Sequence, residues 1–290
     1  MSAIVHHLLR AFGHLPVPRI RGAIWRILGM LHETQLVEFE VRFHGLRYRG
    51  RLDDLIDRSV FFFGSYAPNE LDFLASAARL LGEVQSGVTY FDVGANVGQH
   101  ALFMSPRVEK VFAFEPSRWA LDRFQANVTL NDIGNVYIFP LALGDSDGEG
   151  RLGSGFKGNS GSRSLTWTLD QDAVETVAIR RGDKFLRAMN LPRIDILKLD
   201  VEGYEKRVLK GLRQTLARDR PIILMELIGK SEKSGFANEA ELRQALYTEH
   251  MLFTLRGVGK AKLTPFDWSG EAAVCLPRER ESLFSHAIDA

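Results

Sequence analysis

The sequence lacks several features that would define a class of protein at once. Its 290 residues include a single cysteine, Cys275, which excludes an intramolecular disulfide and a metal site built on several cysteines. No apolar run approaches the roughly 18 residues that cross a bilayer. Neither sign of charge dominates, with 37 Lys and Arg against 36 Asp and Glu, and this balance argues against a dedicated nucleic-acid binder. The single cysteine fits a reducing compartment, and the lack of a membrane span and of a good signal peptide leads us to expect a cytoplasmic protein.

The first 32 residues differ from the rest of the chain in charge. They contain four arginines and no acidic residue, and His6, His7 and Arg10 interrupt their apolar stretch, which disfavours a signal peptide. Apolar residues at helical spacing after Pro18 predict an amphipathic helix. Such a helix either packs on the domain core or lies on a membrane surface or a partner, and the sequence leaves both readings open.

The hydrophobic pattern divides the remainder into an extension and a main domain. Residues 36–52 alternate apolar and charged side chains, which predicts a β-hairpin with one buried face. From Tyr90 onward short apolar runs alternate with helical patterns, which predicts a parallel sheet covered on both faces. We therefore expect an N-terminal helical and hairpin extension over residues 1–58 and an α/β domain over residues 59–290.

Individual elements of the main domain follow from the same pattern. The expected strands span 89–93, 110–114, 136–140, 194–199 and 221–226. The expected helices span 69–81, 98–105, 117–130, 202–218 and 238–250. Two final strands, near 251–255 and 272–276, are expected to pair antiparallel at one edge. Residues 144–170, rich in Gly, Ser and Asp, are interpreted as a long excursion near the active face.

The most informative stretch is residues 90–99, YFDVGANVGQ, which combines a strand, a tight turn with Gly94 and Gly98, and a helix start. The carboxyl end of such a strand is where open α/β sheets bind ligands. A dinucleotide fingerprint, G-x-G-x-x-G, needs a middle glycine, and Asn96 occupies its place. Asp92, just before the loop, would repel a phosphate and attract a cation. A ligand with an amino group and a sulfonium therefore suits the loop better than a dinucleotide.

An acid also ends the second expected strand. Glu115 follows the glycine loop by about 20 residues, where a carboxylate can accept hydrogen bonds from ribose hydroxyls. Taken alone, Glu115 is equally well explained as an exposed carboxylate at a helix start; together with the loop, the ribose role is favoured. Ala142 and Leu143, after the third strand, are expected to flank an adenine ring, and Asp145 to meet its exocyclic amine.

Three more acids lie at the ends of later strands. Asp200 and Glu202 follow the fourth strand, and Glu226 ends the fifth. They are expected to converge as a general base or as oxygen ligands of a divalent cation, and the sequence does not choose between the two. Lys198 shares a strand face with Asp200, either as a structural ion pair or to control the pKa of a catalytic carboxylate. His100, on the first helix, is a minor candidate for the base.

These runs together resemble one known family. FDVGANVG at 91–98, FEP at 114–116, KLDVEGYE at 198–205 and ME at 225–226 resemble the FkbM family of S-adenosylmethionine-dependent methyltransferases, over roughly residues 60–277. The resemblance implies a class I Rossmann-like methyltransferase sheet, mostly parallel, with seven strands and the last one antiparallel. It also implies O-methylation, commonly of sugar hydroxyls or of hydroxylated natural products.

The family pattern also assigns roles to residues of this chain. By resemblance, the loop from Asp92 to Gly98 holds the methionine end of the cofactor, Asp200 lies beside the transferred methyl, and Glu70 closes over the cofactor. The predicted cofactor-binding residues are Glu70, Asp92, Gly94, Ala95, Asn96, Gly98, Glu115, Pro116, Ala142, Leu143 and Asp200. The predicted catalytic residues are Asp200, Glu202 and Glu226, and the need for a divalent cation stays open.

The leading hypothesis is an S-adenosylmethionine-dependent O-methyltransferase that acts on a sugar or on a glycosylated or lipid-linked metabolite. One alternative is a catalytically silent scaffold that binds the cofactor without transferring its methyl group. A nicotinamide-dependent oxidoreductase is disfavoured by Asn96. An RNA methyltransferase is disfavoured by the near-zero charge, although the basic residues 1–32 keep it open. The identity of the acceptor and the oligomeric state, including a homo-oligomer, are not decided by the sequence.

Overall fold

A computed structural model describes residues 37–154, 163–165, 170–227, 235–270 and 272–285, together with Arg10. The amphipathic helix expected after Pro18 lies outside the described residues, so its contact with a membrane or a partner stays a prediction. Within the part that the structure describes, no helix combines the length and the apolar character needed to cross a membrane.

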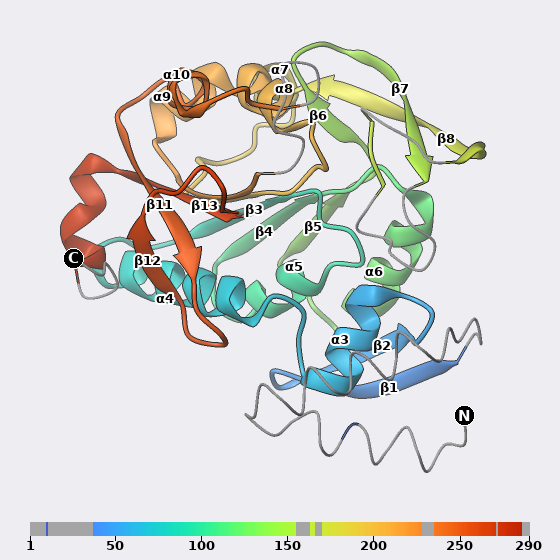
Figure 1. Ribbon diagram of the computed structural model, residues 1–290. Coiled ribbons are helices and arrows are strands. Elements are labelled where there is room, and N and C mark those ends of the chain that lie inside the picture. The colour runs from blue at the N-terminus through green and yellow to red at the C-terminus, as the bar shows by residue number, and fades with distance from the viewer. Residues whose placement is uncertain are drawn as a thin grey trace.

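The core of the molecule is an 8-stranded sheet (Figure 1). Its strands are β3 (Thr89–Val93), β4 (Lys110–Phe114), β5 (Val136–Phe139), β9 (Ile196–Leu199), β10 (Ile222–Glu226), β11 (His250–Arg256), β12 (Lys262–Pro265) and β13 (Ala272–Pro277). Their order is β12-β11-β13-β10-β9-β3-β4-β5. The five strands from β10 to β5 pair in parallel, whereas β13 pairs antiparallel with both of its neighbours. The predicted fold class is confirmed.

Two details of the sheet differ from the expectation. β13 lies between β10 and β11 instead of at an edge, so the two final strands pair antiparallel inside the sheet. The polar connection between them forms β12, an additional edge strand that brings the sheet to eight strands. β12 escaped the sequence pattern because only Leu263 of its four residues is buried, which leaves no alternation to detect.

Helices cover both faces of the sheet and create two hydrophobic clusters (Figure 1). One face carries α4 (Pro68–Val84), α5 (Gln99–Met104) and α6 (Arg118–Leu130). The other carries α7 (Gly182–Ala188), α8 (Glu205–Gly211), α9 (Arg213–Asp219) and α10 (Glu239–Ala245). Strand residues alternate between the clusters, with Tyr90 in the first and Phe91 and Val93 in the second. The single helix expected over 202–218 is observed as two helices, α8 and α9, which are divided at Leu212.

A second, three-stranded sheet replaces much of the excursion expected over residues 144–170. Its strands are β6 (Ala142–Gly144), β7 (Gly148–Ser154) and β8 (Asp170–Arg181), in the order β6-β8-β7. β7 and β8 form an antiparallel pair beside the main sheet (Figure 1). The sequence GEGRLGS hides β7 because glycine has a low strand propensity. Residues 155–162 and 166–169 of this excursion lie outside the described residues.

The N-terminal hairpin forms as expected and is covered by a helix. β1 (Glu38–Phe43) and β2 (Leu46–Arg51) pair antiparallel, and Val41, Phe43 and Tyr48 face the core. Next follows α3 (Leu55–Phe63), whose first turn is capped by the Asp54 carboxylate. The boundary expected between residues 58 and 59 lies within α3, and the division into two domains stays a prediction. Residues Arg278–Phe284 form a short 3-10 helix, η2, after β13.

Asn127 of α6 and Asn131, the residue that follows the helix, complete the exposed edge of β2. Asn127 accepts a hydrogen bond from the Arg49 backbone N–H at 2.7 Å and donates one to its carbonyl at 2.9 Å. Asn131, one turn later, makes the same pair of bonds to Arg47. The side-chain amides thus take the place of a neighbouring strand.

We expect Asn127→Ala to lower the free energy of unfolding by about 1–3 kcal/mol, because it leaves the part-buried backbone N–H and carbonyl of Arg49 without these partners. Urea denaturation measures this change. The control is Asn131→Ala, whose bonds lie at the exposed Arg47 and which should cost about half as much or less. Equal costs for the two variants would contradict an account based on burial.

Candidate active site

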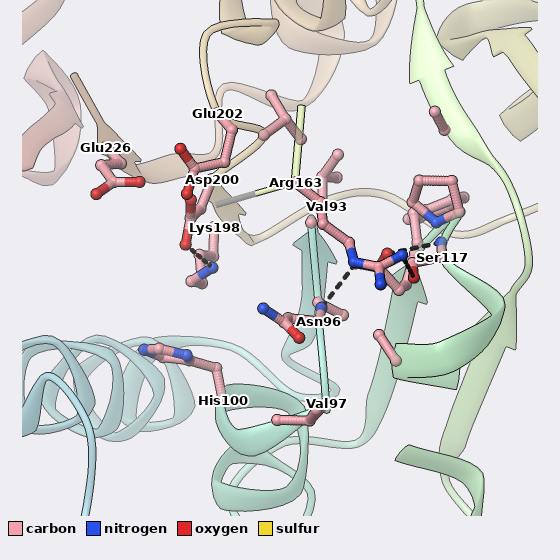
Figure 2. Close-up of a pocket in the computed structure, with 18 of the residues that line it drawn as sticks. Val93, Asn96, Val97, His100, Ser117, Arg163, Lys198, Asp200, Glu202 and Glu226 are labelled. Atoms are coloured by element: carbon pink, nitrogen blue, oxygen red, sulfur yellow. Dashed lines mark hydrogen bonds and ion pairs between the residues drawn. The ribbon is translucent and has the colours of Figure 1, made fainter. Parts of the chain in front are cut away.

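A pocket lies at the carboxyl ends of β3, β4, β9 and β10 (Figure 2). Most of the residues predicted for cofactor or catalysis line it: Glu70, Gly94, Ala95, Asn96, Glu115, Pro116, Ala142, Leu143, Asp200, Glu202 and Glu226. The sequence motifs therefore converge on one cavity although they are distributed over more than 150 residues of the chain. Asp92 and Gly98, by contrast, do not line the cavity.

The turn after β3 is held tightly between two other strand ends. The Gly94 N–H donates to the Phe114 carbonyl at 2.9 Å, and the Asp200 N–H donates to the Val93 carbonyl at 3.0 Å. Gly94 has a φ of 83°, and a Cβ at this position would overlap the backbone carbonyl of Asp200. Only glycine allows both the left-handed backbone and this close approach. The turn therefore leaves an open cradle at the strand end.

Gly98 and Asp92 shape the pocket from behind. Gly98 has a φ of 81° and precedes α5, and a Cβ there would overlap the Phe124 ring. Asp92 is fully buried, and its carboxylate lies 3.7 Å from the Lys198 ammonium. Burial raises the pKa of Asp92, while Lys198 opposes that effect. The two residues support the loop and its charges from outside the cavity.

Glu115 is part of the loop's scaffold as well as of the pocket wall. It is buried, so its interpretation as an exposed carboxylate at a helix start is wrong. One carboxylate oxygen accepts from the Asn96 N–H and the other from the Ser117 N–H, both at 2.8 Å. Burial raises the pKa of Glu115 to about 7 despite these two bonds. Each oxygen retains a further lone pair that can accept a hydrogen bond from a ligand.

Asp200, Glu202 and Glu226 form a carboxylate cluster at the ends of β9 and β10. One oxygen of each lies within 4.8 Å of the others. The Lys198 Nζ lies 3.0 Å from Asp200, and Figure 2 shows this ion pair between the cluster and the glycine turn. Burial alone would lower the pKa of Lys198, but the carboxylates of Asp200 and Asp92 raise it above its ordinary value. The lysine is therefore a fixed positive charge inside the site.

The three carboxyl groups of the cluster differ in the direction of their pKa shifts. Burial and the negative charge of Asp200 raise the pKa of Glu226 to about 11. Burial would also raise the pKa of Asp200, but the Lys198 ammonium and a hydrogen bond with Glu226 keep it below its ordinary value. These opposite shifts favour the proton on Glu226 and the negative charge on Asp200. Burial and the charge of Asp200 raise the pKa of Glu202 to about 8.

Several pocket residues were not foreseen. Gln99, on the first turn of α5, accepts a hydrogen bond from the Tyr66 N–H at 2.8 Å and donates to the Tyr66 carbonyl at 3.2 Å. Arg163 reaches the pocket from a segment without a motif and donates to the Ser117 hydroxyl at 3.1 Å. Only Gln99 had a signal in the sequence, since it directly follows the second glycine of the loop.

Two weaker expectations have different outcomes. His100 lines the pocket, and its Nε2 lies 3.2 Å from the Glu70 carboxylate, so these residues form a pair at one end of the cavity. Asp145, expected to meet an adenine amine, instead forms ion pairs with Lys210 at 3.0 Å and Arg207 at 3.6 Å. It is absent from the lining of the pocket.

The chemistry of the lining fits S-adenosylmethionine. The glycine cradle admits a ligand close to the backbone, and the buried Asn96 Oδ1 has no hydrogen-bond partner among the described residues, so it can accept from a ligand. Five acidic side chains line the cavity against two cationic ones, Lys198 and Arg163, which suits a ligand that carries an ammonium and a sulfonium. Glu115, in another part of the same cavity, offers carboxylate oxygens that can accept hydrogen bonds from ribose hydroxyls.

A mostly parallel sheet with its last strand inserted antiparallel, a glycine turn after β3 and an acid after β4 define a class I Rossmann-like methyltransferase dependent on S-adenosylmethionine. A model of the methyltransferase FkbM domain matches residues 92–259. This is more than half of the chain, and the chain belongs to that family.

The chain is similar to curated methyltransferases over part of its length. The hexuronic acid methyltransferase AglP of Haloferax volcanii is 31% identical over 137 residues, 47% of this chain and 55% of that protein. The 2-O-methyltransferase NoeI of Sinorhizobium fredii is 28% identical over 148 residues, 44% of this chain and 59% of that protein. The chain thus spans little more than half the length of these curated relatives. The solved structure of methyltransferase FkbM from Methylobacillus flagellatus has a TM-score of 0.44 and 14% identity, covering 75% of this chain and 52% of that one.

Proposed function

We propose that this protein transfers the methyl group of S-adenosylmethionine to a hydroxyl of a sugar, carried alone or on a glycosylated or lipid-linked metabolite. The observation that carries the proposal is the carboxylate cluster beside the glycine turn, in which Asp200 lies 3.0 Å from the Lys198 ammonium and within 4.8 Å of Glu202 and Glu226. An alcohol must lose its proton as it is methylated, and a carboxylate at the cofactor cradle can accept that proton. The names of the relatives AglP and NoeI, a hexuronic acid methyltransferase and a 2-O-methyltransferase, support a sugar hydroxyl.

The residues divide the work between binding and proton transfer. The backbone of Gly94, Ala95 and Asn96 would hold the methionine end of the cofactor, and Glu115 its ribose. When bound, S-adenosylmethionine supplies an electrophilic methyl group on a sulfonium. The Asp200 carboxylate accepts the proton of the acceptor hydroxyl, while protonated Glu226 donates a hydrogen bond and keeps the pair from carrying two charges.

Positioning provides much of the rate. Methyl transfer is a displacement that requires the acceptor oxygen to approach in line, and a held geometry saves the entropy of that alignment. Lys198 fixes the Asp200 carboxylate through the 3.0 Å ion pair, and it stays charged because the carboxylates of Asp200 and Asp92 both lie near its ammonium. The lysine therefore orients the base, at the cost of lowering its basicity.

A divalent cation on Asp200, Glu202 and Glu226 is the second candidate for the same cluster. Carboxylate oxygens are suitable ligands for Mg²⁺ or Ca²⁺. The Lys198 ammonium already supplies a positive charge there, which favours the shared proton. Full activity after dialysis against EDTA supports the proton, whereas loss of activity that Mg²⁺ restores supports the cation.

The proposal is tested by incubating the protein with methyl-labelled S-adenosylmethionine and a panel of hexosides, hexuronates and lipid-linked saccharides. We expect label to appear in a saccharide of the panel as an ether that resists mild base, which distinguishes it from a methyl ester. A parallel incubation replaces the saccharides with tRNA. Cofactor binding without methyl transfer to any saccharide or to the tRNA would favour the silent scaffold. Transfer to tRNA alone would favour the RNA methyltransferase.

A further inference from the structure

A second groove meets the cofactor pocket at the carboxylate cluster. Tyr66, Glu70 and Glu226 line both cavities, so the two are continuous at these side chains. Beyond them the groove runs between the start of α4, at Asn69, and the segments around β11 to β13, at Arg256 and Ser269. The glycine turn that the proposed function assigns to the cofactor has no residue in this groove.

The walls of the groove are fixed before any ligand arrives. Gln99 binds both backbone groups of Tyr66, and Ala67, which follows, adopts a left-handed φ of 44° before Pro68 starts α4. On the other side, the Ala261 N–H at the turn between β11 and β12 donates to the Asp72 carboxylate of α4 at 2.8 Å. Figure 1 shows β12 and β11 beside α4. Such a preformed site loses little entropy on binding.

The chemistry of the lining suits a carbohydrate ring. Tyr66 is among the few large apolar side chains that stay exposed, at 37%, and it offers a flat aromatic surface to the C–H face of a sugar. An amide, a hydroxyl and carboxyl groups surround it, from Asn69, Ser269, Glu70 and Glu226. These groups donate and accept hydrogen bonds toward hydroxyls in several directions.

The charge of the groove argues against an anionic occupant. Its single cationic side chain, Arg256, is paired with Asp267 at 2.9 Å. Glu70 and Glu226 stand at the end where the groove meets the cofactor pocket. A phosphate backbone or a uronate carboxylate at that end would meet the Glu70 carboxylate without a free cation among the described lining residues.

We infer that this groove is the acceptor site, and that it binds a neutral saccharide ring stacked on Tyr66 with the reacting hydroxyl directed to Asp200 and Glu226. The inference rests on the proposed function and goes beyond it in naming the site and the charge of its ligand. Asn69 and Ser269 are specificity residues that contact the ring away from the reacting hydroxyl.

The test fills the groove without touching the cofactor pocket. Asn69→Trp and Ser269→Trp each place a bulky side chain in the groove, and both positions are absent from the lining of the cofactor pocket. The matched control is Val84→Trp, at the far end of the same helix, where the side chain is 61% exposed. Saturation-transfer NMR with methyl glucoside, methyl mannoside and methyl glucuronoside measures saccharide binding in the presence of S-adenosylhomocysteine. Calorimetry measures S-adenosylhomocysteine binding separately.

We expect a neutral glycoside to receive saturation from the unmodified protein at least fivefold more strongly than the glucuronoside. Both groove variants should reduce that signal at least fivefold, while the dissociation constant for S-adenosylhomocysteine stays within twofold and Val84→Trp changes neither. Equal saccharide binding in the groove variants, stronger binding of the glucuronoside, or S-adenosylhomocysteine binding without any saccharide binding would overturn the inference. Failure of the unmodified protein to bind S-adenosylhomocysteine would instead remove the proposed function.

Discussion

Asp200→Asn is expected to lower kcat by about 10²–10⁴-fold, the range that a general base contributes, while the dissociation constant for S-adenosylhomocysteine changes less than about threefold. The amide keeps the shape of the side chain and can still receive a hydrogen bond from Lys198, but it cannot accept the proton of the acceptor hydroxyl. Turnover with saturating acceptor and calorimetry with S-adenosylhomocysteine measure the two quantities separately.

Glu226→Gln provides the internal comparison. Burial and Asp200 raise the pKa of Glu226 to about 11, so the side chain is neutral at the pH of the assay and glutamine reproduces its charge. We expect this variant to lose less than about tenfold in kcat. Asp122→Asn, on the exposed face of α6, is a matched control without an expected effect. A large loss in Glu226→Gln with a small loss in Asp200→Asn would reverse the assignment of the base.

Glu115→Ala is expected to weaken S-adenosylhomocysteine binding by about 30–100-fold, equivalent to about 2–3 kcal/mol. The substitution removes acceptors for the ribose hydroxyls and also the partners of the Asn96 and Ser117 N–H groups, which shape the loop. Calorimetry measures the affinity, and thermal unfolding without ligand separates lost contacts from a general loss of folding. Affinity unchanged in a folded Glu115→Ala protein would exclude Glu115 from the cofactor site.

The same carboxyl group predicts a pH dependence. Burial raises the pKa of Glu115 to about 7, so lowering the pH from 8 to 6 protonates it and removes its capacity to accept two hydrogen bonds at each oxygen. Affinity for S-adenosylhomocysteine should fall about tenfold over this interval. Stability of the ligand-free protein should change in the opposite sense, because the raised folded pKa favours the folded state at low pH and this contribution is lost as the pH rises through 7. Glu115→Gln should show a flatter affinity profile.

The main sheet and the cofactor loop could be predicted from the sequence because each depends on local signals. Buried parallel strands are short apolar runs, and the turn between Val93 and Gly98 needs glycine for steric reasons that the structure confirms at Gly94. Motifs at the ends of different strands then had to meet, because parallel strands place their carboxyl ends at one edge.

The other strands and several pocket residues could not be predicted, because they depend on contacts between distant parts of the chain. β12 and β7 are strands because they pair with β11 and β8, although their own residues are polar or glycine-rich. Asp92 lies one strand position below the loop, beside Lys198 of the neighbouring β9, so its buried carboxylate contacts the lysine and does not line the pocket; its predicted contact with the cofactor stays a prediction. Arg163 and Tyr66 reach the pocket through the folding of connections, so only the structure brings them there.

Calorimetric titration of the purified protein with S-adenosylmethionine and S-adenosylhomocysteine, with NAD as the control ligand, tests the central claim most directly. The account predicts micromolar binding of both sulfur ligands and no binding of NAD, because Asn96 and the acidic lining suit a cationic nucleoside and disfavour a pyrophosphate. Binding of NAD, with no binding of S-adenosylmethionine or S-adenosylhomocysteine, would contradict the claim that this pocket is a site for S-adenosylmethionine.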